Sequence, residues 1–100
     1  MNLIKDVKEM VGYSKEGILS KTILKTSELD ITLFCMAAGT KISEHTSTKK
    51  GFVYIIEGKG YFHLEGENIE MKPGIFISMK EKAVHSLEVE RNTSFILVLI

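Results

Sequence analysis

Short runs rich in β-branched, aromatic and aliphatic residues follow one another along this chain, and turn residues separate them. Eight such runs lie at 17–26, 29–38, 51–57, 60–65, 68–72, 75–79, 85–89 and 94–100. Glycine or proline occupies gaps such as 57–60, 66–68 and 72–74, where a chain reversal needs a flexible or fixed φ angle. Closely spaced strands without intervening helical segments are typical of antiparallel sandwiches and closed barrels. The pattern predicts an all-β domain.

The N-terminus has a different pattern from the rest of the chain. Charged residues there separate hydrophobic ones at helical spacing, namely Leu3, Ile4, Val7, Met10 and Val11. This spacing predicts a short amphipathic helix over 1–11 that ends before Gly12. With no linker or internal repeat, we expect a single domain over 1–100, with the β-barrel over 17–100.

The size, cysteine count and charge of the chain exclude several kinds of site and partner. One hundred residues bury roughly two thirds of the surface of the unfolded chain, enough for one core. The lone Cys35 excludes an internal disulfide and a four-cysteine zinc site. Thirteen basic residues balance thirteen acidic ones, so nothing favours binding by bulk attraction to phosphate, and we expect neither nucleic acid nor membrane as partner.

No apolar run approaches the roughly 20 residues that a membrane span requires. The longest is 95–100, and the N-terminus lacks the apolar stretch of a signal peptide. We therefore expect a cytoplasmic protein.

Some of the runs are apolar on both alternating phases. In 31–36 and 95–100, hydrophobic side chains occur at nearly every position, whereas a sheet with one wet face would alternate. We expect the N-terminal helix to cover part of the second face and a second copy of the chain to cover the remainder. The pattern thus predicts a homodimer.

Two segments resemble the conserved motifs of the cupin superfamily. Residues 39–47, with Gly51 and 53–58, are similar to the first motif, and residues 73–85 are similar to the second, whose histidine is His85. The resemblance covers nearly the whole chain. It implies a small cupin-like jelly-roll barrel, or double-stranded β-helix, with a pocket inside.

The resemblance also implies a metal site. In the family, two histidines and a glutamate of the first motif and one histidine of the second converge on a metal. His45 and His85 hold the first and last of these positions, whereas Ser47 and Gly51 replace the second histidine and the glutamate. Further departures from the motifs are Ile75, Lys80 and Val89. The implied metal ligands are His45 and His85, and the cofactor is either a weakly held divalent ion (Zn, Ni, Fe or Mn) or none.

Strand alternation predicts the other pocket residues. If His45 and His85 point inward, then Glu44 and Glu88 point outward, because inward positions recur at every second residue. The predicted pocket set is His45, Ser47, Val53, Ile55, His85 and Leu87. His63 faces solvent or a partner chain, since Phe62 and Leu64 occupy the opposite phase.

The chemistry of the two imidazoles is left open by the sequence. They either hold a divalent ion or hydrogen-bond each other, Ser47 or a ligand, and they are also able to act as general acid and base. We interpret Cys35 and the methionines at 36, 71 and 79 as core packing.

Four lysines flank the two histidine segments. Lys49 and Lys50 follow His45, and Lys80 and Lys82 precede His85. They either ring the pocket mouth and recruit a small anion, such as a carboxylated or phosphorylated metabolite, or form solvated loops compensated by Glu81.

The sequence favours a small-molecule-binding cupin domain of unknown ligand. The alternatives are a metal-dependent cupin enzyme of isomerase or oxygenase type, in which water or substrate replaces the missing ligands, and a non-enzymatic dimeric sensory or stabilising protein.

Overall fold

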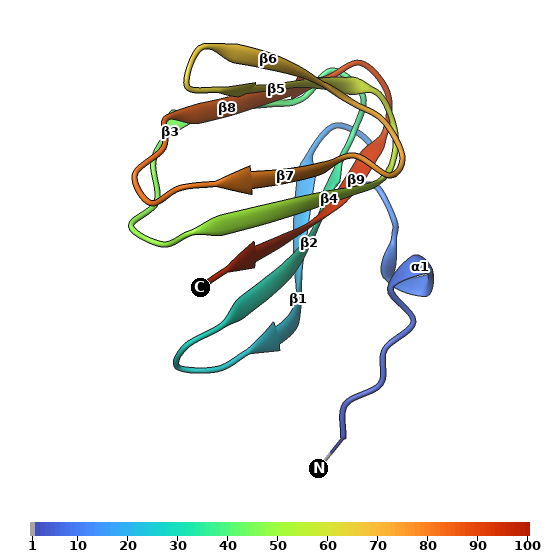
Figure 1. The fold of residues 1–100 in the computed structure, drawn as a ribbon. Coiled ribbons are helices and arrows are strands. Elements are labelled where there is room, and N and C mark those ends of the chain that lie inside the picture. Colours follow the sequence, from blue (N-terminus) through green and yellow to red (C-terminus); the bar gives the residue numbers. More distant parts are fainter. Residues whose placement is uncertain (1) are drawn as a thin grey trace.

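The computed structural model describes residues 2–100 and shows an all-β jelly roll built from two antiparallel sheets (Figure 1). The larger sheet has the order β1-β2-β9-β4-β7, and the smaller has the order β3-β8-β5-β6. The strands are β1 (Ile18–Lys25), β2 (Asp30–Met36), β3 (Lys41–His45), β4 (Gly51–Glu57), β5 (Gly60–Leu64), β6 (Glu67–Met71), β7 (Phe76–Met79), β8 (His85–Val89) and β9 (Thr93–Leu99). The predicted fold class is confirmed.

Strand β3 is absent from the predicted set of eight runs. Its hydroxyl-bearing and charged residues conceal it, because only Ile42 is partly buried and the other four side chains are exposed. Pairing with β8 nevertheless extends the smaller sheet, with a register shift between Ile42 and His45. A shift of this kind is a β-bulge, which re-aims the side chains that follow it.

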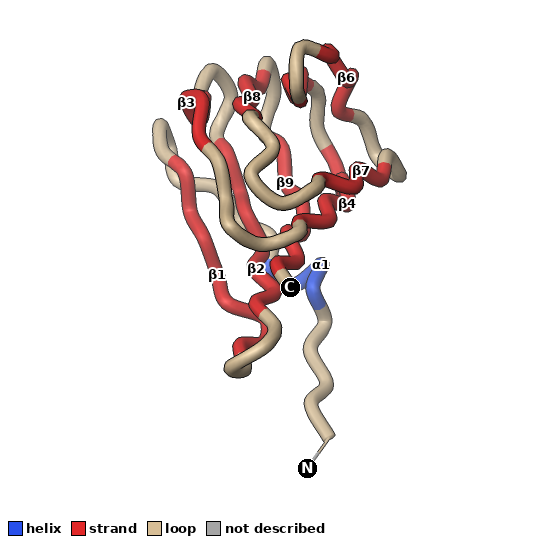
Figure 2. The backbone as a smooth tube through the Cα atoms, turned by 60° about the vertical axis from the view of Figure 1, so that its left-hand side comes forward, coloured by secondary structure: helices blue, strands red, loops and turns tan. Residues whose placement is uncertain are grey.

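The N-terminal helix is shorter than predicted. It spans only Val7–Met10, and Asp6 caps it by accepting hydrogen bonds from the backbone N–H groups of Lys8 and Glu9. The chain before the helix projects from the two sheets in both views (Figure 2), where Lys5 Nζ donates to the Ile23 carbonyl of β1 at 2.8 Å and Ile4 is 91% exposed. A short helix needs an apolar face packed against the fold, whereas Leu3 is 54% exposed and Ile4 is almost fully exposed. Residue 1 of the predicted helix lies outside the described residues.

No helix in residues 2–100 is long and apolar enough to cross a membrane.

The N-terminal segment does cover part of the outer face of the larger sheet, as expected. Leu33 and Cys35 lie on the face of β2 opposite Phe34 and Met36, yet both are fully buried. The segment is held there by the Tyr13 hydroxyl, which donates to Glu57 Oε2 at 2.7 Å, and by the Gly17 carbonyl, which accepts from the Ala37 N–H at 3.0 Å. This arrangement explains why both phases of β2 are apolar.

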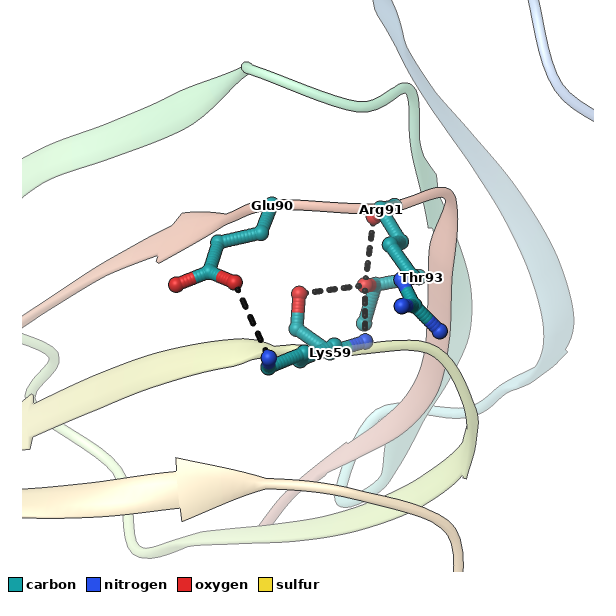
Figure 3. A network of polar contacts seen from close by, with 4 residues as sticks. All are labelled: Lys59, Glu90, Arg91 and Thr93. Carbon is teal, nitrogen blue, oxygen red and sulfur yellow. Dashed lines mark hydrogen bonds and ion pairs between the residues drawn. The ribbon is translucent and has the colours of Figure 1, made fainter.

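A polar network closes one end of the barrel (Figure 3). The buried Thr93 hydroxyl accepts from the Lys59 backbone N–H at 3.1 Å and donates to the Arg91 carbonyl at 2.8 Å. Lys59 Nζ also pairs with Glu90 Oε2 at 3.4 Å. These contacts join the β4–β5 turn to the β8–β9 turn. Because His85 begins β8 and Glu90 follows its last residue, the network and the histidines lie at opposite ends of that strand.

Candidate ligand cavity

A cavity of about 150 Å³ lies between the two sheets. Ten side chains line it, and eight of them are apolar; the lining residues are Phe34, Ile42, His45, Val53, Phe62, Met79, His85, Leu87, Phe95 and Leu97. They come from the inward faces of seven strands, so the barrel itself creates the cavity. The two imidazoles are the polar groups of this wall.

His45 and His85 meet although they lie forty positions apart in the sequence. They are register partners in the β3–β8 pair, and their ring centroids lie 4.0 Å apart with a 58° tilt. The Phe62 ring stacks on His85 with a centroid distance of 5.9 Å. His45 is exposed, whereas His85 is only 8% exposed. His45 therefore lies at the mouth, and His85 lies deeper.

Backbone carbonyls fix the tautomer of both rings. The Nδ1 atom of His45 lies 2.8 Å from the Ser43 carbonyl oxygen, and Nδ1 of His85 lies 2.9 Å from that of Ala83. A carbonyl oxygen only accepts hydrogen bonds, so Nδ1 carries the hydrogen in each ring. Each neutral ring then has a lone pair on Nε2. Within residues 2–100, no hydrogen bond joins the two rings or links either ring to Ser47.

Burial keeps His85 neutral. Loss of solvent lowers its pKa below the ordinary 6.5, the hydrogen bond to the Ala83 carbonyl opposes this shift, and the neighbouring His45 lowers the pKa further. At neutral pH the deep end of the cavity therefore presents an uncharged imidazole that accepts a hydrogen bond through Nε2.

Of the other four predicted pocket residues, two line the cavity and two do not. Val53 and Leu87 line the cavity beside the histidines. Ile55 points inward, but it pairs with Phe95 further along the sheet and is fully buried in the core outside the cavity wall. Ser47 also lies outside the wall, and its hydroxyl accepts from the Lys49 N–H at 3.2 Å. The alternation argument fails at Ser47 because β3 ends at His45, so Ser47 is no longer part of a strand.

The cavity also contains residues that the sequence did not single out as pocket-lining. They are Phe34, Ile42, Phe62, Met79, Phe95 and Leu97. Strand alternation already pointed Phe62 inward. For the others, only the pairing of strands distant in sequence shows that they share this space, as in the stack of Phe34 on Phe95 with centroids 5.2 Å apart.

The side chains of the cavity that are able to ligate a metal do not match the ligand set implied by the family. No group of three or more His, Cys, Asp or Glu side chains able to hold an ion occurs in the described part of the chain. Glu44 is exposed on the outer surface, and Gly51 has no side chain. Catalytic zinc typically has three protein ligands, and non-haem iron enzymes use two histidines and a carboxylate. The two imidazoles fall short of either set.

The four lysines lie in the two loops next to His45 and His85 and do not line the cavity. All four are exposed, and the Lys82 N–H donates to the Ser47 carbonyl at 2.7 Å, which places the 80–84 loop against the 46–50 loop. Among residues 2–100, none of the four forms an ion pair with a carboxylate, Glu81 included.

His63 points away from the cavity, as the alternation indicates. It lies on the outer face of the smaller sheet between the Asn68 side chain and Glu88 Oε1, which is 3.3 Å from its Nε2 atom. The hydrogen bond to Asn68 raises its pKa above 6.5, and the bond to Glu88 adds to this effect. Glu88 therefore pairs with His63 on the outer surface of the smaller sheet.

A two-sheet jelly roll that encloses a cavity with inward-facing histidines defines a barrel-type pocket domain. The family model described as Cupin domain matches residues 32–100, and the chain belongs to this family. An uncharacterized protein of Aquifex aeolicus (strain VF5) is 29% identical over 99 residues, which cover 97% of this chain and 79% of the relative.

Two solved structures illustrate the similarity of fold. A conserved protein of unknown function from Streptococcus pyogenes is 25% identical, with a TM-score of 0.87 over 97% of this chain and 85% of its own. A cupin superfamily protein from Desulfitobacterium hafniense is 15% identical, with a TM-score of 0.90 over 100% of this chain and 95% of its own.

Proposed function

We propose that this cupin domain binds a compact apolar molecule with one acidic or hydrogen-donating group. The observation that carries the proposal is the cavity itself, whose apolar wall is interrupted by two imidazoles with unoccupied Nε2 lone pairs. A volume of about 150 Å³ suits a ligand the size of a single six-membered ring. Burial of the ring supplies affinity, and the imidazoles fix its orientation.

The positive charge near the mouth of the cavity is the reason for proposing an acidic group on the ligand. Neutral Nε2 atoms accept a hydrogen bond from a protonated acid or a phenol, and a ring that takes up the proton donates to the resulting anion. Lys49, Lys50, Lys80 and Lys82 surround this end and attract an anion from solution. Reversible binding needs no further residue, whereas the metal-dependent alternative lacks the carboxylate that such enzymes use.

A thermal-shift screen tests the proposal. Benzoate, phenol and branched short-chain acids are the probes, with cyclohexane as an apolar reference. A ligand that binds only the folded chain stabilises it by about 2.7 kcal/mol at a hundred times its Kd. We expect the acidic ring compounds to raise the melting temperature of the native chain and to lose this effect in His85→Ala. If no acidic probe stabilises the native chain more than cyclohexane does, the proposal is wrong.

We also infer that the domain works as a homodimer. Phe76 is 62% exposed and Tyr54 is 47% exposed on the outer face of neighbouring strands, which the N-terminal segment leaves uncovered. Phe52 stacks on Phe76 with centroids 6.0 Å apart, so these side chains form one apolar surface. Such a surface is suited to a two-fold contact with its own copy.

A further inference from the structure

Ser94 carries a buried hydroxyl that the fold leaves without a partner. The side chain lies in β9 and is fully buried, and within residues 2–100 its Oγ atom forms no hydrogen bond. A buried polar group without a partner is costly, so native proteins keep few of them. This hydroxyl therefore marks a place where a small movement gains a hydrogen bond.

The nearest available acceptor for this hydroxyl belongs to Tyr13 of the N-terminal segment. Ser94 is the register partner of Glu57 in β4, and the Tyr13 hydroxyl donates to Glu57 Oε2 at 2.7 Å. The Ser94 side chain lies close enough to oppose the rise in the pKa of Tyr13. Because the Tyr13 hydrogen is given to Glu57, the lone pairs of its oxygen are free to accept a bond from Ser94.

The cavity wall lies directly behind Ser94, on the inner face of the same strand. Phe95 follows Ser94 in β9, and its register partner in β2 is Phe34. These two phenyl rings stack with centroids 5.2 Å apart and line the cavity. Successive residues of a strand point to opposite faces of the sheet, so a movement of β9 affects the cavity wall and the Ser94 hydroxyl together.

The N-terminal segment is held by hydrogen bonds more than by buried side chains. None of residues 2–17 is fully buried. Hydrogen bonds of the Lys5, Tyr13 and Lys21 side chains join the segment to the larger sheet. Segments with few buried apolar contacts open locally at a small cost in free energy. One added hydrogen bond therefore changes how often the segment opens.

We propose that Ser94 couples the N-terminal segment to the cavity, so that the domain senses a small molecule inside it. A molecule in the cavity presses on the stack of Phe34 and Phe95 and moves β9 outward, because a closely packed interior transmits strain. The Ser94 hydroxyl then donates to the Tyr13 oxygen, which donates in turn to Glu57. The inference needs only an occupied cavity and not the acidic group of the proposed ligand.

The outer surface receives the signal. Val7 and Lys8 of the segment line a groove together with Tyr54, which belongs to the apolar surface inferred to self-associate. Closure of the segment fixes this groove when the cavity is filled. By linkage, the closed segment raises the affinity for the molecule in the cavity by the same factor.

Amide hydrogen exchange with benzene as the probe tests the coupling. Benzene has no acidic group and fits an apolar cavity of about 150 Å³. In the native chain, saturating benzene should slow exchange over residues 7–13 about fivefold, the effect of one hydrogen bond, and leave the 26–29 turn unchanged. In Ser94→Ala, benzene should leave exchange over residues 7–13 unchanged.

Benzene affinities, measured from the Val53 and Leu87 methyl shifts, separate coupling from a structural role. Ser94→Ala removes a hydroxyl without a partner, so the melting temperature of the benzene-free chain should not fall. Ser94→Ala, Tyr13→Phe and the double variant should each weaken benzene binding about fivefold, because each removes the same bond. Ser78→Ala, at an exposed position of β7, is the matched control and should bind benzene as the native chain does.

The proposal is overturned if benzene shifts the cavity methyl groups and leaves exchange over residues 7–13 unchanged. It is also overturned if the slowing survives in Ser94→Ala, if the two single effects multiply in the double variant, or if benzene shifts no cavity methyl group. None of these results decides whether acidic probes bind better than cyclohexane, so the proposed ligand is tested separately.

Discussion

The orientation of the two cavity histidines is set within their own segments. Each imidazole directs its Nδ1 hydrogen to the carbonyl two residues earlier, on Ser43 for His45 and on Ala83 for His85. The Nε2 atoms are thereby left for the cavity before any ligand arrives. Binding then does not require the rings to give up an existing partner at that atom, which reduces the cost of ordering the site.

The titration of His85 should differ from that of His63 in the metal-free protein. Burial lowers the pKa of His85 below 6.5, so its contribution to the free energy of unfolding is present above pH 6.5 and is lost as the pH falls. The Asn68 contact raises the pKa of His63, so its contribution is present below pH 6.5 and is lost as the pH rises. NMR titration of the ring protons measures both. A pKa of His85 at or above that of His63 would contradict the burial of the imidazole.

At the scale of strands and loops, the sequence predicts what depends on local patterns and misses what depends on pairing. The all-β class and most strands follow from hydrophobic runs and turn residues. β3 has no apolar pattern of its own, and its pairing with β8 creates the histidine pair. Ser47 lies outside the cavity wall because β3 ends at His45, and alternation does not continue beyond the end of a strand. The cavity wall around Phe34 and Phe95 depends on β2 and β9 being neighbours, which no local signal reveals.

The N-terminal segment should loosen at alkaline pH. Burial raises the pKa of Tyr13 to about 12, the nearby Ser94 side chain opposes this shift, and the hydrogen bond to Glu57 adds to it. Because the folded pKa lies above the ordinary 10, the stabilisation by neutral Tyr13 is complete below pH 10 and is lost as the pH rises towards 12.

Tyr13→Phe removes the bond to Glu57 and should cost about 1 kcal/mol at pH 8. The difference in stability between native and variant chains should shrink between pH 10 and 12, as measured by urea unfolding. Tyr61→Phe, on an exposed side chain, is the control. A pH-independent difference for Tyr13→Phe would show that its hydroxyl does not hold the segment.

The two lysine-bearing loops should affect anionic ligands selectively. Replacing Lys49, Lys50, Lys80 and Lys82 with glutamine should weaken benzoate binding about tenfold at low salt and leave phenol binding unchanged, because only benzoate is charged at pH 7. The deficit should vanish in 1 M salt, where the Debye length is about 3 Å. Glutamine at Lys8, Lys15, Lys25 and Lys72 is the matched control. Equal benzoate affinity in both quadruple variants at low salt would exclude anion recruitment by these loops.

For the whole molecule, the jelly roll creates two distinct faces for the larger sheet. Its inner face forms the cavity, and its outer face is shared between the N-terminal segment and the exposed pair Tyr54 and Phe76. The end near Thr93 is closed by hydrogen bonds, whereas the histidine end has the 46–50 and 80–84 loops and the exposed His45. The proposed ligand entry and the inferred self-association would therefore use separate surfaces.

Self-association should depend on the exposed aromatic surface. Phe76→Glu places a charge in the inferred contact and should convert a dimer to a monomer, as measured by sedimentation equilibrium. Glu81→Gln, on the 80–84 loop, should leave the mass unchanged. A native chain that is monomeric at 100 times the concentration used for binding, or a dimeric Phe76→Glu chain, would contradict the inferred interface.

The most direct measurement of the central claim is a methyl NMR titration with benzoate on three chains. Leu97→Phe places a phenyl ring in the cavity from its own wall, and Val98→Phe places the same ring at the next residue, on the opposite face of β9. The account predicts shifts of the Val53 and Leu87 methyl groups in the native and Val98→Phe chains, and none in the Leu97→Phe chain. Equal binding by all three folded chains, or shifts confined to the outer face, would show that the ligand does not enter the cavity.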